Sequence, residues 1–216
     1  MPSWNALGTS ALHGLAAIVA PPRCAACDAR VRLAAVFCPA CASTLEGDPA
    51  SSPASISAFV YGGALARALA RLKYEQRPDL GEPLGALLAL EVQARGLHIG
   101  DAVVVPVPLH VSRLAERGFN QSALIARPIA RLLRIPMFPL ALMRVRDTPQ
   151  QASLDRIGRI ANVAAAFRAR PRARLQGRSV LLVDDVRTTG ATIEACTRAL
   201  KDGGAAAIVH AVVARA

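Results

Sequence analysis

Apolar runs of strand length alternate with segments of helical spacing through most of the chain. A strand that is buried on both faces of a sheet needs an unbroken apolar run, so these runs are typical of a parallel sheet covered by helices. The sequence predicts strands over residues 55–61, 101–108, 179–185 and 205–214. The alternation of strands and helices predicts an α/β fold with a doubly wound, mostly parallel sheet.

Four segments between these strands have the apolar spacing of amphipathic helices. We expect the helices over residues 63–74, 80–95, 120–134 and 192–202. Pro128 interrupts the third segment, and because proline removes a backbone hydrogen bond we expect a kink or a break there. Residues 148–167 have mixed spacing and are expected to form a loop that leads into a helix.

Composition divides the 216-residue chain into three parts. An N-terminal helix and a cysteine-rich ribbon, a Pro/Ser-rich linker and the α/β domain are expected at residues 1–47, 48–56 and 57–216, respectively. No apolar run approaches the roughly 20 residues that a membrane span requires. The chain also lacks the basic start of a signal peptide, so we expect a cytoplasmic protein.

The formal net charge is +11, and arginine supplies nearly all of the positive charge because the chain has only the lysines Lys73 and Lys201. Such a balance favours partners that carry phosphate, although a compositional bias of the source genome would explain the same excess. One short segment holds five of the arginines: Arg168, Arg170, Arg172, Arg174 and Arg178. They are candidates for contacts with single-stranded nucleic acid or, equally, for a solvated loop.

The segment "SVLLVDDVRTTGATIEA" joins a buried strand to a helix through a polar turn. Paired carboxylates at the carboxyl end of a parallel strand can accept hydrogen bonds from sugar hydroxyls or hold Mg²⁺. The following turn leads into a helix N-terminus, which binds anions, and its glycine permits a close approach of the backbone. The sequence therefore predicts a sugar-phosphate site at Asp184, Asp185, Thr188, Thr189, Gly190, Ala191 and Thr192.

Three other interpretations of this segment are weaker. A helix cap formed by Asp185 or Thr192 would explain one residue and not the whole run. A nucleoside triphosphatase would need the G-x-x-x-x-G-K-[ST] loop, and neither lysine is followed by serine or threonine. A dinucleotide fold would need G-x-G-x-x-G, which the chain also lacks.

The run "VLLVDDVRTTGAT" resembles the phosphoribosyl-pyrophosphate (PRPP) signature of type I phosphoribosyltransferases. The resemblance implies that Asp184 and Asp185 face the ribose hydroxyls, that residues 188–192 surround the 5-phosphate, and that Mg²⁺ accompanies PRPP. It also specifies the doubly wound sheet as one of the type I phosphoribosyltransferase kind. Arg187 departs from many members of that superfamily, which carry a small or apolar residue at its position.

The segment "VVVPVPLHVSRLAERGFNQSALIA" looks like the ComF family of competence proteins, and the likeness covers nearly the whole chain. Prolines give a rigid turn and arginines supply cations, so we expect the pyrophosphate side of the site at Pro106, Val107, Pro108, Arg113 and Arg117. A solvent-exposed basic helix is the alternative. The resemblance further implies a flexible loop over the substrate that includes Thr148, Gln151, Arg159 and Asn162.

Two C-x₂-C pairs lie ten residues apart, at Cys24, Cys27, Cys38 and Cys41. Four thiolates in two such pairs match a closed, structural zinc site, and members of the ComF family carry an N-terminal zinc ribbon. A disulfide would need an oxidising compartment, and a thioredoxin-like motif would explain only one pair. Cys196 stands alone on an apolar helix face and is expected in the core.

Together these features and resemblances predict a PRPP-binding protein of the ComF type that assists the uptake of single-stranded DNA, either directly or through a helicase partner. An active phosphoribosyltransferase is one alternative, since a nucleophile that attacks the ribose would release pyrophosphate. A non-enzymatic PRPP sensor is another. The sequence contains no base-binding segment that would identify the acceptor.

Overall fold

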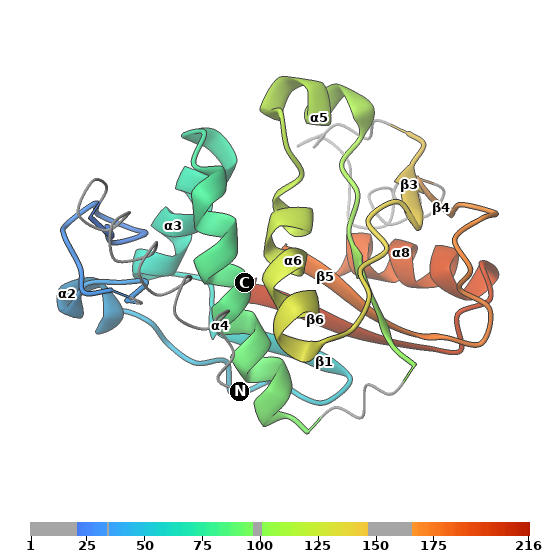
Figure 1. The fold of residues 1–216 in the computed structure, drawn as a ribbon, viewed down its shortest axis with the longest axis horizontal. Helices are drawn as coiled ribbons and strands as arrows, with labels where there is room; N and C mark the ends of the chain where they lie inside the picture. Colours follow the sequence, from blue (N-terminus) through green and yellow to red (C-terminus); the bar gives the residue numbers. More distant parts are fainter. Residues whose placement is uncertain (1–20, 34, 97–100, 147–165) are drawn as a thin grey trace, which may run out of the picture.

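The computed structural model describes residues 21–33, 35–96, 101–146 and 166–216 of the chain. Its centre is a four-stranded sheet with the order β1-β6-β5-β2, in which every neighbouring pair is parallel (Figure 1). The strands are β1 (Ser55–Val60), β2 (Val103–Pro106), β5 (Ser179–Arg187) and β6 (Ala207–Arg215). Each predicted apolar run therefore overlaps one strand of the sheet, and β5 and β6 end slightly beyond the predicted runs.

Helices cover both faces of this sheet. Helices α3 (Gly63–Tyr74), α4 (Gly81–Ala94) and α6 (Gln121–Leu133) pack into one apolar cluster with one set of strand side chains. Helix α8 (Ala191–Asp202) packs into a second cluster with the other set. Leu181 and Leu182 show the alternation, because these neighbours on β5 belong to different clusters. Burial on both faces explains why the strands are apolar without interruption.

A small antiparallel hairpin lies beside α8. It consists of β3 (Leu142–Arg144) and β4 (Phe167–Ala169), and Leu142 and Phe167 are buried in the second cluster. The sequence pattern did not predict these strands, because three residues are too few to show a period. Residues 148–167, predicted as a loop and a helix, lie outside the described residues except for their last two, of which Phe167 begins β4.

Helix α6 continues through Pro128, so of the kink or break expected at this proline the break does not occur. The ring of Pro128 is buried against α4, where a Cβ added at Gly85 would lie 2.5 Å from Pro128 Cγ and 2.2 Å from the carbonyl oxygen of Ile125. Gly85 thus lets the two helices approach closely. Burial of the ring against this neighbour offsets the missing backbone hydrogen bond.

Shorter elements complete the described chain: helix α2 (Pro39–Ala42), the 3₁₀ turn η1 (Pro78–Leu80) and helix α5 (Val111–Arg117). The apolar stripe over residues 7–18 lies outside the described residues. Buried Asp48 accepts two hydrogen bonds from Arg215, of 2.8 and 2.7 Å, which tie the segment before β1 to the last strand. Within the described residues, no helix has both the length and the apolar character that crossing a membrane requires.

Candidate functional site

A cavity of about 500 Å³ opens where β2 and β5 end. It brings together residues that are far apart in the sequence: Lys73, Tyr74, Val107, Pro108, Leu109, Arg113, Arg117, Gln121, Ser122, Arg144, Asp184, Asp185 and Thr192. The carboxyl ends of parallel strands are the usual ligand site of a doubly wound sheet. The structure thus places both predicted carboxylates and both predicted arginines around one space.

The two carboxylates belong to the last two buried residues of β5. Asp184 and Asp185 are only 8% and 4% exposed. Ser122 donates a hydrogen bond of 2.8 Å from its hydroxyl to Asp184 Oδ1, and the backbone N–H of Asp185 donates a second of 2.9 Å. Burial and then the negative charge of Asp185 raise the pKa of Asp184 to about 8. Binding of a cation or of hydroxyl donors would relieve this concentration of charge.

Lys73 supplies one cation to the pair. It is the penultimate residue of α3, and its ammonium forms an ion pair with Asp185 Oδ2, which has no hydrogen-bond partner among the described residues. Burial alone would lower the pKa of Lys73, but the nearby acidic groups, Asp185 first and then Asp184, together outweigh burial and raise it. Lys73 therefore stays charged and partly neutralises the carboxylates.

The turn after β5 forms a smaller hollow of about 30 Å³ next to the cavity, and Asp184 and Thr192 line both spaces. Thr188, Thr189, Gly190 and Ala191 also line the hollow. Gly190 precedes α8 with a φ of 83°, a left-handed conformation that favours glycine. Because the first N–H groups of a helix have no partner within it, this hollow can receive an anion.

The predicted pyrophosphate side lies across the cavity. Val107 and Pro108 line it directly, whereas Pro106 is the last residue of β2 and does not. Arg113 and Arg117 reach it from α5, which is a short helix with no buried residue. The Arg117 guanidinium donates a hydrogen bond of 2.6 Å to Gln121 Oε1 and lies 5.7 Å from the centre of the Tyr74 ring.

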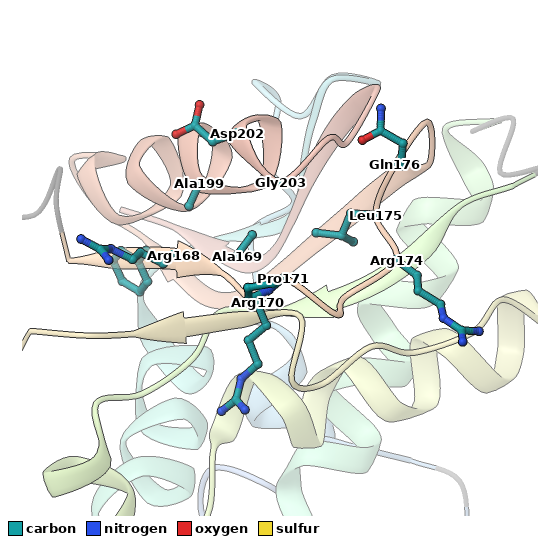
Figure 2. A pocket seen from close by; sticks show the side chains of 11 residues that line it. Arg168, Ala169, Arg170, Pro171, Arg174, Leu175, Gln176, Ala199, Asp202 and Gly203 are labelled. Carbon is teal, nitrogen blue, oxygen red and sulfur yellow. The ribbon is translucent and has the colours of Figure 1, made fainter.

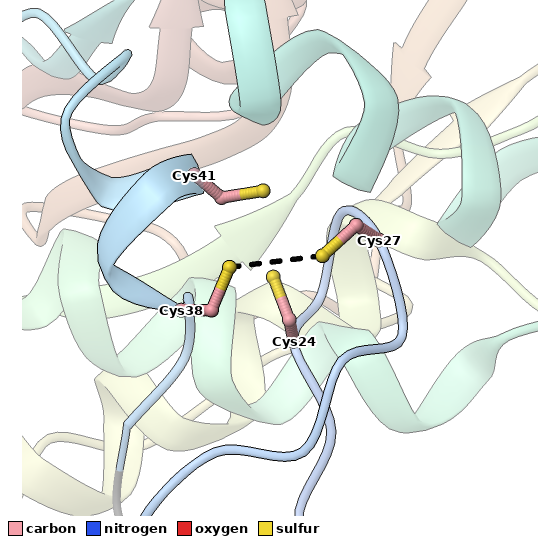
Figure 3. A group of neighbouring side chains, drawn as sticks. All are labelled: Cys24, Cys27, Cys38 and Cys41. Atoms are coloured by element: carbon pink, nitrogen blue, oxygen red, sulfur yellow. Dashed lines mark hydrogen bonds between the residues drawn. The ribbon is translucent and has the colours of Figure 1, made fainter.

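The four cysteines of the two pairs form one cluster away from this cavity (Figure 3). All four sulfur atoms lie within 4.8 Å of one another, and Cys27 Sγ and Cys38 Sγ are 3.7 Å apart. Sulfur atoms on a tetrahedron around zinc are separated by about 3.8 Å, given Zn–S bonds of about 2.3 Å. The cluster can therefore hold a metal ion. Cys196 is buried in the core on α8, as predicted.

The comparisons with known proteins agree with this geometry. The phosphoribosyl transferase domain family matches residues 120–216. The DNA utilization protein YhgH of Escherichia coli strain K12 is 37% identical over 152 residues, which cover 68% of this chain and 66% of that protein, just under two thirds of its length. Competence protein F of Haemophilus influenzae is 30% identical over 188 residues, 85% of this chain and 80% of that protein. The chain belongs to the ComF family of competence proteins.

A comparison with solved structures gives a weaker likeness. Glutamine PRPP amidotransferase from B. subtilis is 22% identical, with a TM-score of 0.44, and the match covers 65% of this chain and 30% of that one. For this ComF protein, the family match and the parallel sheet with helices on both faces confirm the predicted type I phosphoribosyltransferase fold.

Several cavity residues of this ComF protein were not predicted from the sequence: Lys73, Tyr74, Leu109, Gln121, Ser122 and Arg144. Asn120 is a residue type that is favoured at helix N-caps, so it could have indicated the position of Ser122. As the N-cap of α6 it accepts a hydrogen bond from the N–H of Ser122, and it donates one of 3.0 Å to the carbonyl of Val107. The cap therefore fixes Ser122 beside Asp184. The predicted loop residues Thr148, Gln151, Arg159 and Asn162 lie outside the described residues.

A basic groove lies where β5 begins, at the end of the sheet opposite the carboxylates. It consists of two adjoining hollows of about 540 and 520 Å³ that share Arg170 and Arg174. Arg168, Arg170 and Arg174 point in different directions along the surface (Figure 2). Within the described part of the chain, none of the five arginines from 168 to 178 forms an ion pair with a carboxylate.

Proposed function

We propose that the protein binds PRPP together with Mg²⁺ in the cavity at the ends of β2 and β5. The observation that supports this most is the buried carboxylate pair next to a helix N-terminus, with Lys73, Arg113 and Arg117 around the same space. A ligand with vicinal hydroxyls and phosphates at both ends matches this order of groups. Carboxylate oxygens at such a site suit Mg²⁺, which would neutralise charge on the pyrophosphate.

In this proposal each side chain has a distinct task. Asp184 and Asp185 accept hydrogen bonds from the ribose hydroxyls, and the N–H groups at the start of α8 receive the 5-phosphate. Arg113 and Arg117 donate to the pyrophosphate from α5. Ser122 holds the Asp184 carboxylate in place through its 2.8 Å hydrogen bond.

Calorimetric titration of PRPP tests the proposal. We expect binding in the presence of Mg²⁺ and much weaker binding without it, because the carboxylates and the pyrophosphate would repel each other. Ribose 5-phosphate and pyrophosphate alone, each carrying half of the contacts, serve as controls and should bind more weakly than PRPP. Absence of heat with PRPP and Mg²⁺ in correctly folded protein would overturn the assignment.

Catalysis of phosphoribosyl transfer is the alternative, and Tyr74 favours it. The ring lies in the cavity wall with 75% of the residue exposed, so it offers a face on which an acceptor base can stack. In that reaction the acceptor would form a bond to ribose C1 and pyrophosphate would leave with the bonding electrons. Release of pyrophosphate from PRPP with a panel of bases separates an enzyme from a protein that only binds or senses PRPP.

We also propose that the basic groove contacts single-stranded DNA during uptake, in line with relatives named competence protein F and DNA utilization protein. The arginines point apart, which suits a chain of phosphates better than a single anion. Phe138 and the exposed Leu140 line the same groove and offer apolar surface to bases. A helicase partner would deliver or receive the strand in this scheme.

Replacing Arg170, Arg172 and Arg174 with glutamine should weaken binding of single-stranded DNA and lower the slope of log K against log salt by about 2, since each lost phosphate contact removes about 0.7. A matched triple variant at exposed Arg30, Arg32 and Arg127 makes the same change of charge outside the groove and should retain most of the slope. Fluorescence anisotropy at several salt concentrations gives both values. Equal losses in the two variants would mean that net charge, and not the groove, binds DNA.

We further propose that the cysteine cluster holds one structural zinc ion. All four thiol groups are needed for tetrahedral coordination, so no position is left for a substrate. The proposal places the protein in the cytoplasm, where thiols stay reduced and available to a metal. Burial raises the pKa of Cys24, but hydrogen bonds from the backbone N–H groups of Cys38, Ala26 and Cys27 outweigh burial and lower it to about 6. Burial and then the neighbouring cysteines raise the pKa of Cys41 to about 12, so without a metal the four thiols do not all ionise together.

A further inference from the structure

Helix α3 connects the cysteine cluster with the proposed PRPP cavity. Its buried Arg71 donates hydrogen bonds from Nη1 to the carbonyl oxygens of Cys24 (3.3 Å) and Ala25 (3.1 Å). The other terminal nitrogen, Nη2, lies 2.9 Å from Asp28 Oδ2. One guanidinium therefore holds the loop that carries Cys24 and Cys27 at three points.

The same side chain also fixes the end of α3. Arg71 Nε donates a hydrogen bond of 3.1 Å to Glu75 Oε2, and Glu75 follows the last helical residue. The final turn of a helix frays unless tertiary contacts hold it, so these bonds stabilise the turn that contains Lys73 and Tyr74. Lys73 and Tyr74 are the two residues that α3 contributes to the cavity.

Residues 71 and 73 point about 200° apart around the helix axis, because each residue of an α-helix turns by about 100°. Arg71 therefore faces the cysteine loop while Lys73 faces the sheet and pairs with Asp185. Because residues 71–73 belong to one turn of α3, a shift of the cysteine loop that moves Arg71 would also move the ammonium group of Lys73 beside Asp185.

We propose that Arg71 is a positioning residue that couples the cysteine cluster to Lys73, so that metal in the cluster raises the affinity of the cavity for PRPP. The inference rests on the proposed PRPP and zinc sites. It assigns to the cysteine ribbon a role in ligand binding beyond its own folding. Loss of the metal, or oxidation of the cysteine thiols, would lower PRPP affinity without any change to a residue that touches PRPP.

The first test compares PRPP binding by calorimetry in zinc-loaded protein, zinc-stripped protein and an Arg71→Met variant that retains zinc. We expect about tenfold weaker binding in the last two, a coupling of ordinary size. Arg77→Gln is the matched control, since Arg77 also contacts Asp28, at 3.2 Å, but within the described part of the chain it donates no hydrogen bond to the carbonyls of Cys24 and Ala25. Its affinity should stay within about twofold of the original. Circular dichroism and metal analysis establish folding and zinc content.

A Lys73→Met variant tests the route. Its PRPP affinity should be low already and should not fall further when zinc is removed, because the coupled group is gone. Linkage also requires the reverse effect: PRPP with Mg²⁺ should make zinc about tenfold harder to extract with a chelator. Amide hydrogen exchange over residues 71–75 should rise in the Arg71→Met variant, a readout that is independent of binding.

The outcomes separate the inference from its premises. Failure of the zinc-loaded original protein to bind PRPP would overturn the proposed function itself. Unchanged PRPP affinity in folded, zinc-stripped protein and in Arg71→Met would overturn the coupling and leave the PRPP site intact. A zinc effect of equal size in the Lys73→Met variant would show that the coupling does not pass through Lys73.

Discussion

Replacing both Asp184 and Asp185 with asparagine is expected to abolish PRPP binding, with a loss on the order of 100-fold or more, and to leave the fold intact. Asparagine keeps the size of each side chain, and its oxygen can still accept the bonds that Ser122 and the backbone of Asp185 give to Asp184. The change removes the charge that would face Mg²⁺ and the hydroxyls, and with it the ion pair between Asp185 and Lys73. Calorimetry measures the loss, and Asp202→Asn, an exposed carboxylate near the far end of α8, is the control.

The single variant Asp184→Asn should at the same time stabilise the unliganded protein. Its raised pKa of about 8, against an ordinary value of 3.8, means that folding forces this carboxyl to stay protonated or to carry a buried charge. The original protein therefore loses stability as the pH rises from the unfolded to the folded pKa, and the variant does not. Its advantage should be absent near pH 4 and should grow as the pH rises to about 8.

Urea unfolding at several pH values without PRPP measures this difference. If the variant is equally stable or less stable than the original protein at every pH, ionisation of Asp184 does not destabilise the folded protein and the prediction is wrong. The pair of results, weaker binding and greater stability, is typical of a residue that is retained for a ligand and not for the fold.

Loss of the metal site is expected to have the second large effect. Cys24→Ser with Cys41→Ser should remove the zinc and expose residues 21–46 to rapid hydrogen exchange, while the sheet stays protected. Zinc contributes on the order of 10 kcal/mol to the folding of small cysteine ribbons. Asp28, Arg71 and Arg77 form ion pairs at this ribbon, but Asp28 is partly exposed, so they cannot replace the metal.

Metal analysis should find one zinc per chain in the original protein and none in this double variant. Cys196→Ala is the matched control, since it removes a buried cysteine outside the cluster and should keep the zinc. Protein prepared without chelator that contains no zinc would contradict the assignment, as would a double variant with unchanged exchange in residues 21–46.

Local patterns were enough to predict much of this protein. The sheet strands and their helices follow from apolar runs and helical spacing, because each element must bury its own side chains. The turn after Asp185 and the two cysteine pairs lie within short segments, where spacing alone brings the groups together. The local pattern did not show that helix α6 continues through Pro128, since its continuity there depends on the close approach at Gly85 in a neighbouring helix.

Contacts between distant segments were decided only by the tertiary structure. Lys73 reaches Asp185, Ser122 reaches Asp184, and Arg71 reaches the carbonyls of the cysteine loop across long stretches of sequence. Nothing in the local pattern of α3 distinguishes Arg71 from the exposed arginines of the chain. By itself the sequence was enough to predict the four strands of the sheet, the helices α3, α4, α6 and α8, and the segments proposed to bind ligands. Packing of the helices on the sheet decided which side chain meets each carboxylate, because that choice depends on how far each helix end extends past the strands.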